Sequence, residues 1–273
     1  MLLYGANSKE RIKPMQKLNL FVLFFMFWHV NANAFSVEHT FFVTVGSFDA
    51  CLTTFRYDLT PARYAVTSDI TTNGIFNSIY PFVASYTTSG RITEQGLVTT
   101  DYGYSSKSRF NTRTKKVFYN QNGQPLYRIS SKNNKSKKQE FSLPNKPVDT
   151  YDLQTIIAKL TKQYSELGFC NSKQTVFDGK HYFSVEFNDE GEETLQPNQH
   201  SMFSGKAAKC SLKINKETTN EDDTLWQFAS QKDIYFWIAK DRKYNHPFIA
   251  QIKIKQTPLG ELTAYLSNLK VEE

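Results

Sequence analysis

The sequence contains none of the short motifs that usually identify an enzyme. It has no HExxH pair for zinc, no GxSxG nucleophile elbow and no glycine-rich phosphate loop. Its three cysteines, Cys51, Cys170 and Cys210, are too far apart in the chain for a CxxC redox or zinc motif. We therefore expect no catalytic residue, no metal site and no cofactor, which excludes the common enzyme classes that these motifs mark.

Long apolar runs are also scarce, and the clearest one stands near the start. Leu18–Trp28 is interrupted only by Asn19, and it follows the positive charges of Lys13 and Lys17. Small residues follow at Asn31–Ala34. These three parts are typical of a cleavable secretory signal. A transmembrane helix needs roughly 20 apolar residues, so a retained membrane anchor is the less favoured interpretation.

We thus expect residues 1–34 to be a signal peptide, with Met15 as an alternative start, and residues 35–273 to be one exported domain. No proline-rich or glycine/serine-rich linker divides that part of the chain. The expected location is the periplasm of a bacterial cell envelope. Removing residues 1–34 takes away four positive charges and one negative charge, so the formal net charge falls from +7 to +4. This mild excess favours contact with anionic headgroups or envelope polymers and not with nucleic acid.

Most of the predicted domain alternates between apolar and polar residues, as half-buried strands do. Phe41, Val43 and Val45 share one side of the first run. Asn122-Gly123 and Asp178-Gly179 predict two hairpins with type I′ turns, and Ser89-Gly90 is read as a further interruption between strands. The clearest later strands are 207–214, 234–239, 248–256 and 262–269, whereas 188–199 and 216–223 are polar and are predicted as loops.

One segment has helical periodicity. In Tyr151–Leu167 the apolar residues recur in steps of three and four, which predicts one amphipathic helix. Asp149 or Thr150 is expected to cap its start, and Gly168 to end it. The helix is either a structural plug on the concave side of a sheet or a mobile lid over a ligand cavity, and periodicity does not separate the two.

In an oxidising compartment a cysteine pair favours a disulfide. We favour Cys170 with Cys210, because both lie beside strand-like segments. Closing a loop of that length contributes on the order of 4 kcal/mol to stability. Cys51 remains, either as a buried and inert thiol or as a reactive one. The histidines of this part are His39, His181, His200 and His246, and none has a sequence context that identifies a catalytic triad.

Positive charge gathers between residues 107 and 138, on both sides of the predicted Asn122-Gly123 hairpin. If that hairpin forms, it makes one basic surface that either protects a sheet edge against aggregation or contacts anionic polymer, lipid headgroups or a partner protein. The residues are Lys107, Arg109, Arg113, Lys115, Lys116, Arg128, Lys132, Lys135, Lys137 and Lys138.

Several stretches together resemble the bacterial domain-of-unknown-function family 3108 of exported envelope proteins. They include FFVTVGSFDACLTTF, VDTYDLQTIIAKL, TVFDGKHYFSVEF and AAKCSLKI, and they occur in order through nearly the whole predicted domain. The resemblance implies a long, curled antiparallel sheet, an open barrel or half-barrel, around one helix. It supports the Cys170–Cys210 disulfide and implies no catalytic residues. Cys51 and the lysine-rich segment 132–138 depart from the family pattern.

The function that fits best is a binding or scaffold protein that supports the cell envelope, with an apolar or lipid ligand or with a protein partner. A binding protein predicts a concave sheet lined by aromatic side chains. The alternatives are an enzyme that acts on cell-wall or lipopolysaccharide material, which needs paired carboxylates or a nucleophile with its base, and a purely structural partner in a larger complex.

Overall fold

The computed structural model describes residues 34–94, 96–141, 150–180, 182–216, 233–241 and 244–272. The chain divides into two units, Met1–Asn33 and Ala34–Glu273, and the described residues belong to the second. The predicted signal peptide, apart from Ala34, lies outside the described residues, as do Asp149, His181 and most of the predicted loop 216–223. Within the described ranges, no helix is long and apolar enough to cross a membrane.

The second unit is built on one sheet of fifteen strands, in the order β8-β7-β6-β5-β4-β3-β2-β1-β15-β14-β13-β12-β11-β10-β9. Neighbours pair antiparallel, except β9 and β10, which pair parallel. The first eight strands are β1 (Phe35–Val45), β2 (Phe48–Leu59), β3 (Arg63–Thr72), β4 (Phe82–Thr93), β5 (Gly96–Ser108), β6 (Thr112–Tyr119), β7 (Pro125–Lys132) and β8 (Lys135–Glu140). The others are β9 (Thr150–Tyr151), β10 (Ser172–Phe177), β11 (Tyr182–Leu195), β12 (Gly205–Lys216), β13 (Ile234–Asp241), β14 (Tyr244–Thr257) and β15 (Gly260–Glu272).

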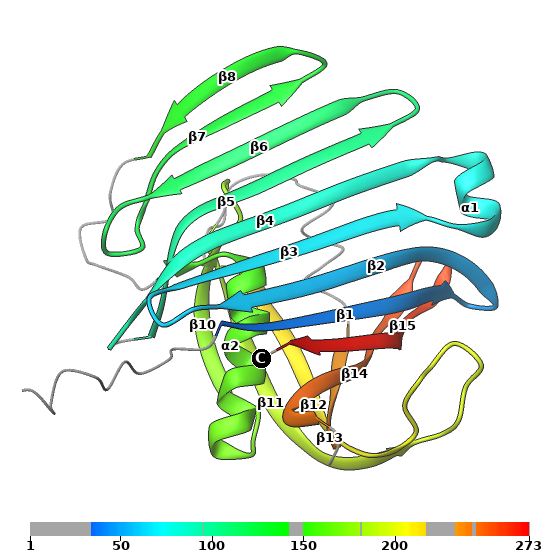
Figure 1. Cartoon of the computed structure of the whole chain (residues 1–273). Coiled ribbons are helices and arrows are strands. Elements are labelled where there is room, and N and C mark those ends of the chain that lie inside the picture. The colour runs from blue at the N-terminus through cyan, green and yellow to red at the C-terminus, as the bar shows by residue number, and fades with distance from the viewer. Residues whose placement is uncertain are drawn as a thin grey trace, which may run out of the picture. The chain divides into compact units, whose positions relative to one another are not determined.

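The first and last strands meet in the middle of this sheet, because β1 pairs with β15. One half of the sheet therefore runs outward from β1 to β8, and the other runs from β15 back to β9. Figure 1 shows the two halves turning toward each other as one curled surface. The prediction of a long, curled antiparallel sheet is confirmed.

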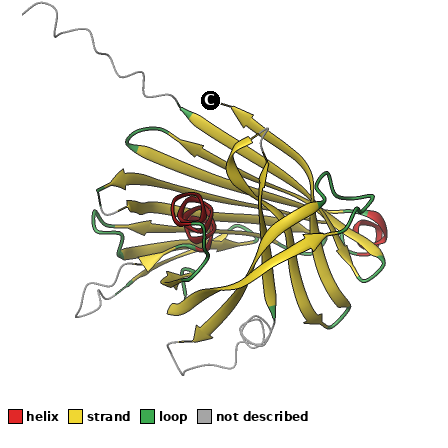
Figure 2. Cartoon of the chain, turned by 90° about the horizontal axis from the view of Figure 1, so that it is seen from below, coloured by secondary structure: helices red, strands yellow, loops and turns green. Residues whose placement is uncertain are grey.

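The predicted helix is α2 (Leu153–Leu167), and it lies inside the curl, where it packs against β3, β5, β10 and β14. Figure 2 looks along α2 and shows the sheet around it. Gly168 ends the helix with φ 76°, as predicted. The predicted start is wrong, because the N-cap is Asp152, whose side chain accepts from the backbone N–H groups of Gln154 and Thr155. Thr150 lies in β9 instead.

Both predicted hairpins form, as β6–β7 and β10–β11. The first turn is longer than the predicted two-residue type I′ turn, since β6 ends at Tyr119 and β7 begins at Pro125. Asn120 organises it: its side-chain oxygen accepts from the N–H groups of Asn122 and Gln124 at 2.8 and 3.0 Å. Gly123 alone of the predicted pair has a positive φ, 74°.

Three polar or glycine-containing segments that show no strand pattern in the sequence lie within strands. Residues 188–195 continue β11 through a bulge between Asp189 and Glu192. Lys135–Glu140 is the edge strand β8, which pairs with β7. Ser89-Gly90 lies inside β4, where a Cβ on Gly90 would stand 2.2 Å from the Tyr64 ring, so glycine is needed there for packing and not for a turn.

A short helix that the sequence pattern did not predict, α1 (Gly74–Ile79), connects β3 to β4. The backbone N–H of Asn73 donates to Ala50 O at 2.8 Å, which holds the start of α1 against β2.

The core occupies the inside of the curl. Its largest part lies between α2 and strands of the C-terminal half, with β1, and contains Ile156, Leu160, Phe187, Phe248 and Leu266. Two smaller clusters involve the N-terminal half, one around Tyr64 and Val66, and the other between Val117 of β6 and Phe177 of β10. The concave face is therefore lined by aromatic and aliphatic side chains.

Candidate functional site

The start of α2 is held to the sheet by a buried polar network around Asp152, which is 0% exposed. One carboxylate oxygen accepts from the Thr88 hydroxyl at 2.7 Å, and the other accepts from the Thr99 hydroxyl at 3.1 Å. The Thr155 hydroxyl donates to the same carboxylate. Thr88 lies on β4 and Thr99 on β5, so a single side chain caps the helix and also fixes its position on the sheet.

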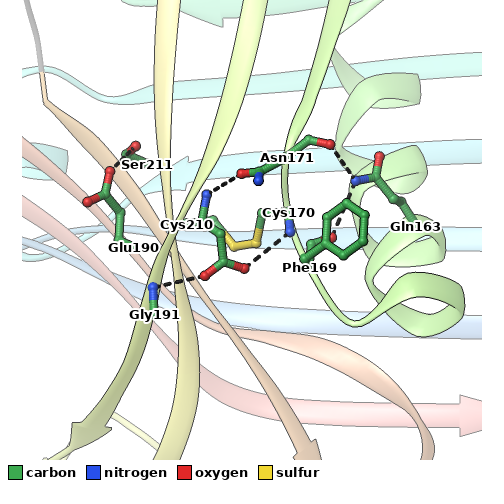
Figure 3. Close-up of a disulfide and its surroundings, with 9 residues drawn as sticks. Gln163, Phe169, Cys170, Asn171, Glu190, Gly191, Cys210 and Ser211 are labelled. Carbon is green, nitrogen blue, oxygen red and sulfur yellow. Dashed lines mark hydrogen bonds between the residues drawn. A yellow bond between two sulfur atoms is a disulfide. The ribbon is translucent and has the colours of Figure 1, made fainter.

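The other end of α2 is held by the cysteine pair (Figure 3). Cys170 and Cys210 are bonded, with their Cα atoms 6.0 Å apart, as expected for a disulfide. Both are fully buried. On the helix side, the Gln163 amide donates to Phe169 O and to Asn171 O at 3.3 and 2.9 Å. These contacts join both ends of α2 to the sheet, which favours the structural plug over the mobile lid.

Between these two ends, a pocket of about 170 Å³ lies where α2 faces β1, β2 and β14. Most of the side-chain surface that faces the pocket is apolar, although several of the lining residues carry a polar group. Alternate residues of β1 and β2 face it, because side chains on every second strand position share one face. They are Phe35, Val37 and His39 on β1, and Phe55, Tyr57 and Leu59 on β2. The helix contributes Ala158, Thr161, Lys162 and Ser165, and β14 contributes His246 and Pro247.

Two polar side chains in this apolar pocket have no hydrogen-bond partner among the described residues. They are His39, which is only 4% exposed, and Tyr57. By distance and angle, neither ring nitrogen of His39 makes a well-formed hydrogen bond, and its one polar neighbour is the backbone of Phe55. The Tyr57 hydroxyl makes no hydrogen bond. Each such group costs about 1 to 3 kcal/mol. Buried polar groups in folded proteins nearly always have a partner, so this pair requires an explanation.

The pocket also favours neutral side chains. Burial lowers the pKa of His39 to about 4, and the neighbouring charge of His246 lowers it further, while a weak hydrogen-bonding interaction with the backbone of Phe55 opposes the shift. Burial raises the pKa of Tyr57. Near neutral pH, His39 is therefore an uncharged ring with one N–H donor and one nitrogen acceptor. Together with the Tyr57 hydroxyl, it offers both donors and acceptors to a polar group in an apolar space.

The ten basic residues predicted as a surface lie on β5–β8 and the turn between β5 and β6, but on different faces. Residues directly opposite each other in an antiparallel pair share a face. Arg113 pairs with Lys132, and Lys132 pairs with Lys135. By the same register, Lys115, Arg128 and Lys137 share their concave face. Lys107, Lys116 and Lys138 belong to the opposite face, and Arg109 stands in the turn after β5.

Four of these cations have structural partners. The Lys115 ammonium donates to Asp178 O and the Arg128 guanidinium donates to Gly179 O, which ties β6 and β7 to the β10–β11 turn. Burial is the main reason that the pKa of Lys115 is lowered. On the opposite face, Lys116 pairs with Asp101 at 3.4 Å and Lys138 with Glu140 at 3.0 Å.

The remaining concave-face cations have no ion-pair partner in the described ranges. Arg113, Lys132, Lys135 and Lys137 line a shallow cleft of about 380 Å³ beside Tyr104. The hairpin thus brings these cations together, although they form a smaller group than the ten predicted. Lys135 and Lys137 belong to an edge strand and not to a loop.

Cys51 is partly buried on β2, on the same face as the core. Burial raises the pKa of its thiol to about 11. At neutral pH it is a thiol and not a thiolate, which favours the inert interpretation because the thiolate is the nucleophile. Among the described residues, no three histidine, cysteine or acidic side chains gather as metal ligands do.

The pocket was missed by motif searches, since it contains no motif. The sequence signal for the pocket was the alternation of residues along β1. His39 is at an odd-numbered position, as are Phe41, Val43 and Val45, and it therefore faces inward with them. The partner residues on β2, α2 and β14 are distant in sequence and could not be placed beside it.

Comparison with known proteins gives a family and a fold. The profile of the family DUF3108, described as a protein of unknown function, matches residues 34–267. A beta-barrel-like protein of the domain of unknown function DUF1849 from Brucella abortus has a similar structure, with a TM-score of 0.50 and 9% sequence identity over 87% of this chain and 98% of that one. No curated protein matches the chain.

Proposed function

From its geometry we propose that this chain, which belongs to the DUF3108 family, is a binding protein of the cell envelope and not an enzyme. Its site is the pocket between α2, β1, β2 and β14. The ligand is an amphipathic small molecule whose apolar end enters the pocket and whose polar group bonds to His39 and Tyr57. The observation that carries the proposal is the presence of two unsatisfied polar side chains in an otherwise apolar pocket.

The size of the pocket limits the part of the ligand that enters. Its volume of about 170 Å³ is near that of an engineered apolar cavity, about 150 Å³, that holds benzene. Sites for drug-sized molecules are larger, about 300 to 1,000 Å³. A short alkyl segment or a single ring therefore fits, and a longer acyl chain would extend out past Lys162 and Ser165 on α2.

The uncharged state of His39 limits which kinds of polar group the ligand carries at this end. A hydroxyl, carbonyl or protonated carboxyl group can exchange hydrogen bonds with a neutral imidazole and a tyrosine hydroxyl. An ionised carboxylate can accept from a neutral imidazole N–H and from a tyrosine hydroxyl, but it loses its hydration on entering an apolar pocket, which is costly. We therefore expect a neutral polar group at this end of the ligand.

The envelope location is supported by two features. Residues 1–34 have the pattern of a cleavable secretory signal. The buried cysteine pair at disulfide distance suits an oxidising compartment such as the periplasm. A small apolar or lipid molecule of the envelope is then the class of ligand available.

The test compares two probes that differ by one hydroxyl, octan-1-ol and octane, with the chain from residue 34 onward. In Tyr57→Phe the ring stays and the hydroxyl is lost. We expect this variant to bind octan-1-ol about tenfold more weakly, as the loss of one hydrogen bond implies, with octane binding unchanged. Titrations followed by the imidazole NMR signals of His39 measure both.

Tyr80→Phe is the matched control, since Tyr80 is an exposed tyrosine outside the pocket, and it should leave both affinities unchanged. If the unaltered chain binds octane and octan-1-ol equally well, or binds neither, the proposed site is wrong.

A further inference from the structure

One end of the sheet carries a row of exposed apolar side chains on four successive connections. We call it the apolar rim. It consists of Phe48, Ile75, Ile79, Tyr80, Phe110 and Leu259. Phe110 is 69% exposed, Leu259 68% and Ile79 66%. Figure 1 shows α1 at this end, beyond the ends of β3 and β4.

Direct contacts show that these connections are neighbours. The N–H of Gly46, in the β1–β2 turn, donates to Glu261 O at 2.8 Å, beside the β14–β15 turn that carries Leu259. The start of α1 is hydrogen-bonded to β2 through Asn73 and Ala50. The rings of Tyr80, after α1, and Phe110, in the β5–β6 turn, are 6.4 Å apart. The rim is therefore one continuous feature of the fold.

No core contact explains these side chains. The helix α1 has no buried residue, although Ile75 and Ile79 are two of its six residues. Single exposed apolar residues are ordinary, whereas a contiguous group marks a surface that contacts a partner or a membrane.

Cations adjoin the rim and define what it contacts. Lys107 and Arg109 both shortly precede Phe110 in the sequence, and Lys107 is directly opposite Val83 in the pairing of β4 with β5. Arg113 follows the β5–β6 turn, whereas Lys132 and Lys135 stand on either side of the β7–β8 turn. The three residues are consecutive cross-strand neighbours. The Thr112 N–H donates to the Asn133 side chain at 2.9 Å, which joins the two turns.

The described part of the chain has no carboxylate within ion-pair distance of these five cations. Glu261, which follows the Leu259 turn, is already paired with Lys253 at 2.9 Å. Asp49 adjoins Phe48 in sequence and makes no ion pair with a described residue. The charge beside the rim is therefore mainly positive and available.

We propose that the apolar rim, with Lys107, Arg109, Arg113, Lys132 and Lys135, docks on an anionic lipid bilayer. Aromatic and aliphatic side chains beside lysine and arginine suit the interface of a membrane, where the apolar groups enter the headgroup boundary and the cations meet lipid phosphates. Side chains on separate turns give the shallow insertion that such a surface needs. This inference does not depend on the proposed ligand pocket, since it uses none of its residues.

The test is co-sedimentation of the chain from residue 34 onward with two kinds of vesicle. One contains phosphatidylglycerol and phosphatidylcholine, and the other contains phosphatidylcholine alone. We expect binding to the anionic vesicles, weakened by added salt. The double variant Phe110→Ser, Ile79→Ser should bind at least about tenfold more weakly, because two apolar insertions are lost. Lys107→Gln with Arg109→Gln should remove most of the preference for anionic vesicles.

Leu167→Ser is the matched control, because Leu167 is an exposed leucine at the end of α2, and it should bind as the unaltered chain does. The thermal stability of each variant is measured first, and only variants as stable as the unaltered chain are compared. A folding defect is then not mistaken for weaker binding to vesicles. Equal binding by the unaltered chain and the Phe110, Ile79 variant would overturn the proposal, as would no binding to anionic vesicles. A dimer in sedimentation velocity that the same variant abolishes would assign the rim to a second copy of the chain instead.

Discussion

His39 is the residue in which packing and chemistry conflict most clearly. It continues the inward-facing series of β1, is directly opposite Phe55 on β2 and Leu269 on β15, and lies 6.1 Å from the Phe55 ring by centroids. A phenylalanine would suit these neighbours better than a histidine whose two nitrogens make no well-formed hydrogen bond. Retaining an imidazole here is understandable if its hydrogen bonds are made to a ligand.

The pH dependence of stability tests the burial of His39. Its pKa falls from 6.5 to about 4 on folding, so the unfolded chain binds more protons between these values. Stability should therefore decrease as pH falls below 6.5 and level off below about 4. The other titratable or charged groups facing His39 are Tyr57, His246 and Lys162. We expect the free energy of unfolding in urea to fall by about 2 to 3 kcal/mol between pH 7 and pH 4.5 through His39 alone.

His39→Phe should remove that part of the pH dependence and leave stability at pH 7 equal or higher, because an unsatisfied polar group is lost. His200→Gln, which changes a histidine outside the pocket, should keep it. The same slope in His39→Phe as in the unaltered chain would mean that His39 is not buried as described.

At the scale of elements, α2 determines the pocket, and Asp152 determines where α2 lies. Its carboxylate receives hydrogen bonds from two sheet strands and from the first turn of the helix. Tyr64 extends this network, since its hydroxyl lies 3.2 Å from that of Thr99 and 3.0 Å from that of Thr155. The exposed helix caps of most proteins stabilise only the helix, whereas this one also joins the helix to the sheet.

Asp152→Ala should therefore cost more than an ordinary helix cap. An exposed N-cap is worth about 1 kcal/mol, and here the Thr88, Thr99 and Thr155 hydroxyls also lose a buried acceptor, so we expect a loss of about 3 kcal/mol or more. Urea unfolding measures the loss, and hydrogen exchange should show the α2 amides opening first. Glu166→Ala, an exposed site on the same helix, should change stability by less than about 0.5 kcal/mol. A similar small effect for Asp152→Ala would show that the network does not hold the helix.

The elements that could be predicted from the sequence are those with one apolar face and one polar face. α2 and the strands around Phe41 and around the Asp178-Gly179 turn have one apolar face, and their periodicity identified them. β8 was missed because all six of its residues are exposed, so no alternation marks it. Residues 188–195 were missed for a related reason, since most of this part of β11 is exposed beyond the bulge.

The site was less predictable than the fold, because it is formed by residues that are far apart in the sequence. Its residues come from β1, β2, α2 and β14, and contacts between such distant segments depend on the pairing of β1 with β15 at the centre of the sheet. The disulfide pairing was within reach, because three cysteines allow few combinations. The cap at Asp152 was not, because Thr88 and Thr99 become its partners only when the sheet curls around the helix.

At the scale of the whole unit, the sheet separates a buried interior from an exposed end. The interior holds a fixed helix and an apolar pocket with two unsatisfied polar groups. The exposed end holds the apolar rim and its cations. These two features together suit a protein that binds an amphipathic ligand at the cell envelope, and each can be tested without the other.

The claim that this pocket binds a ligand is tested most directly by native mass spectrometry of the protein purified from the cells that produce it, compared with its denatured mass. The account predicts an additional small amphipathic molecule that is present in the native spectrum, is lost on denaturation, and is absent from Thr161→Phe, in which a larger side chain occupies the pocket. A native mass equal to the chain alone in the unaltered protein, or the same bound molecule in Thr161→Phe, would contradict the claim that this pocket binds a ligand.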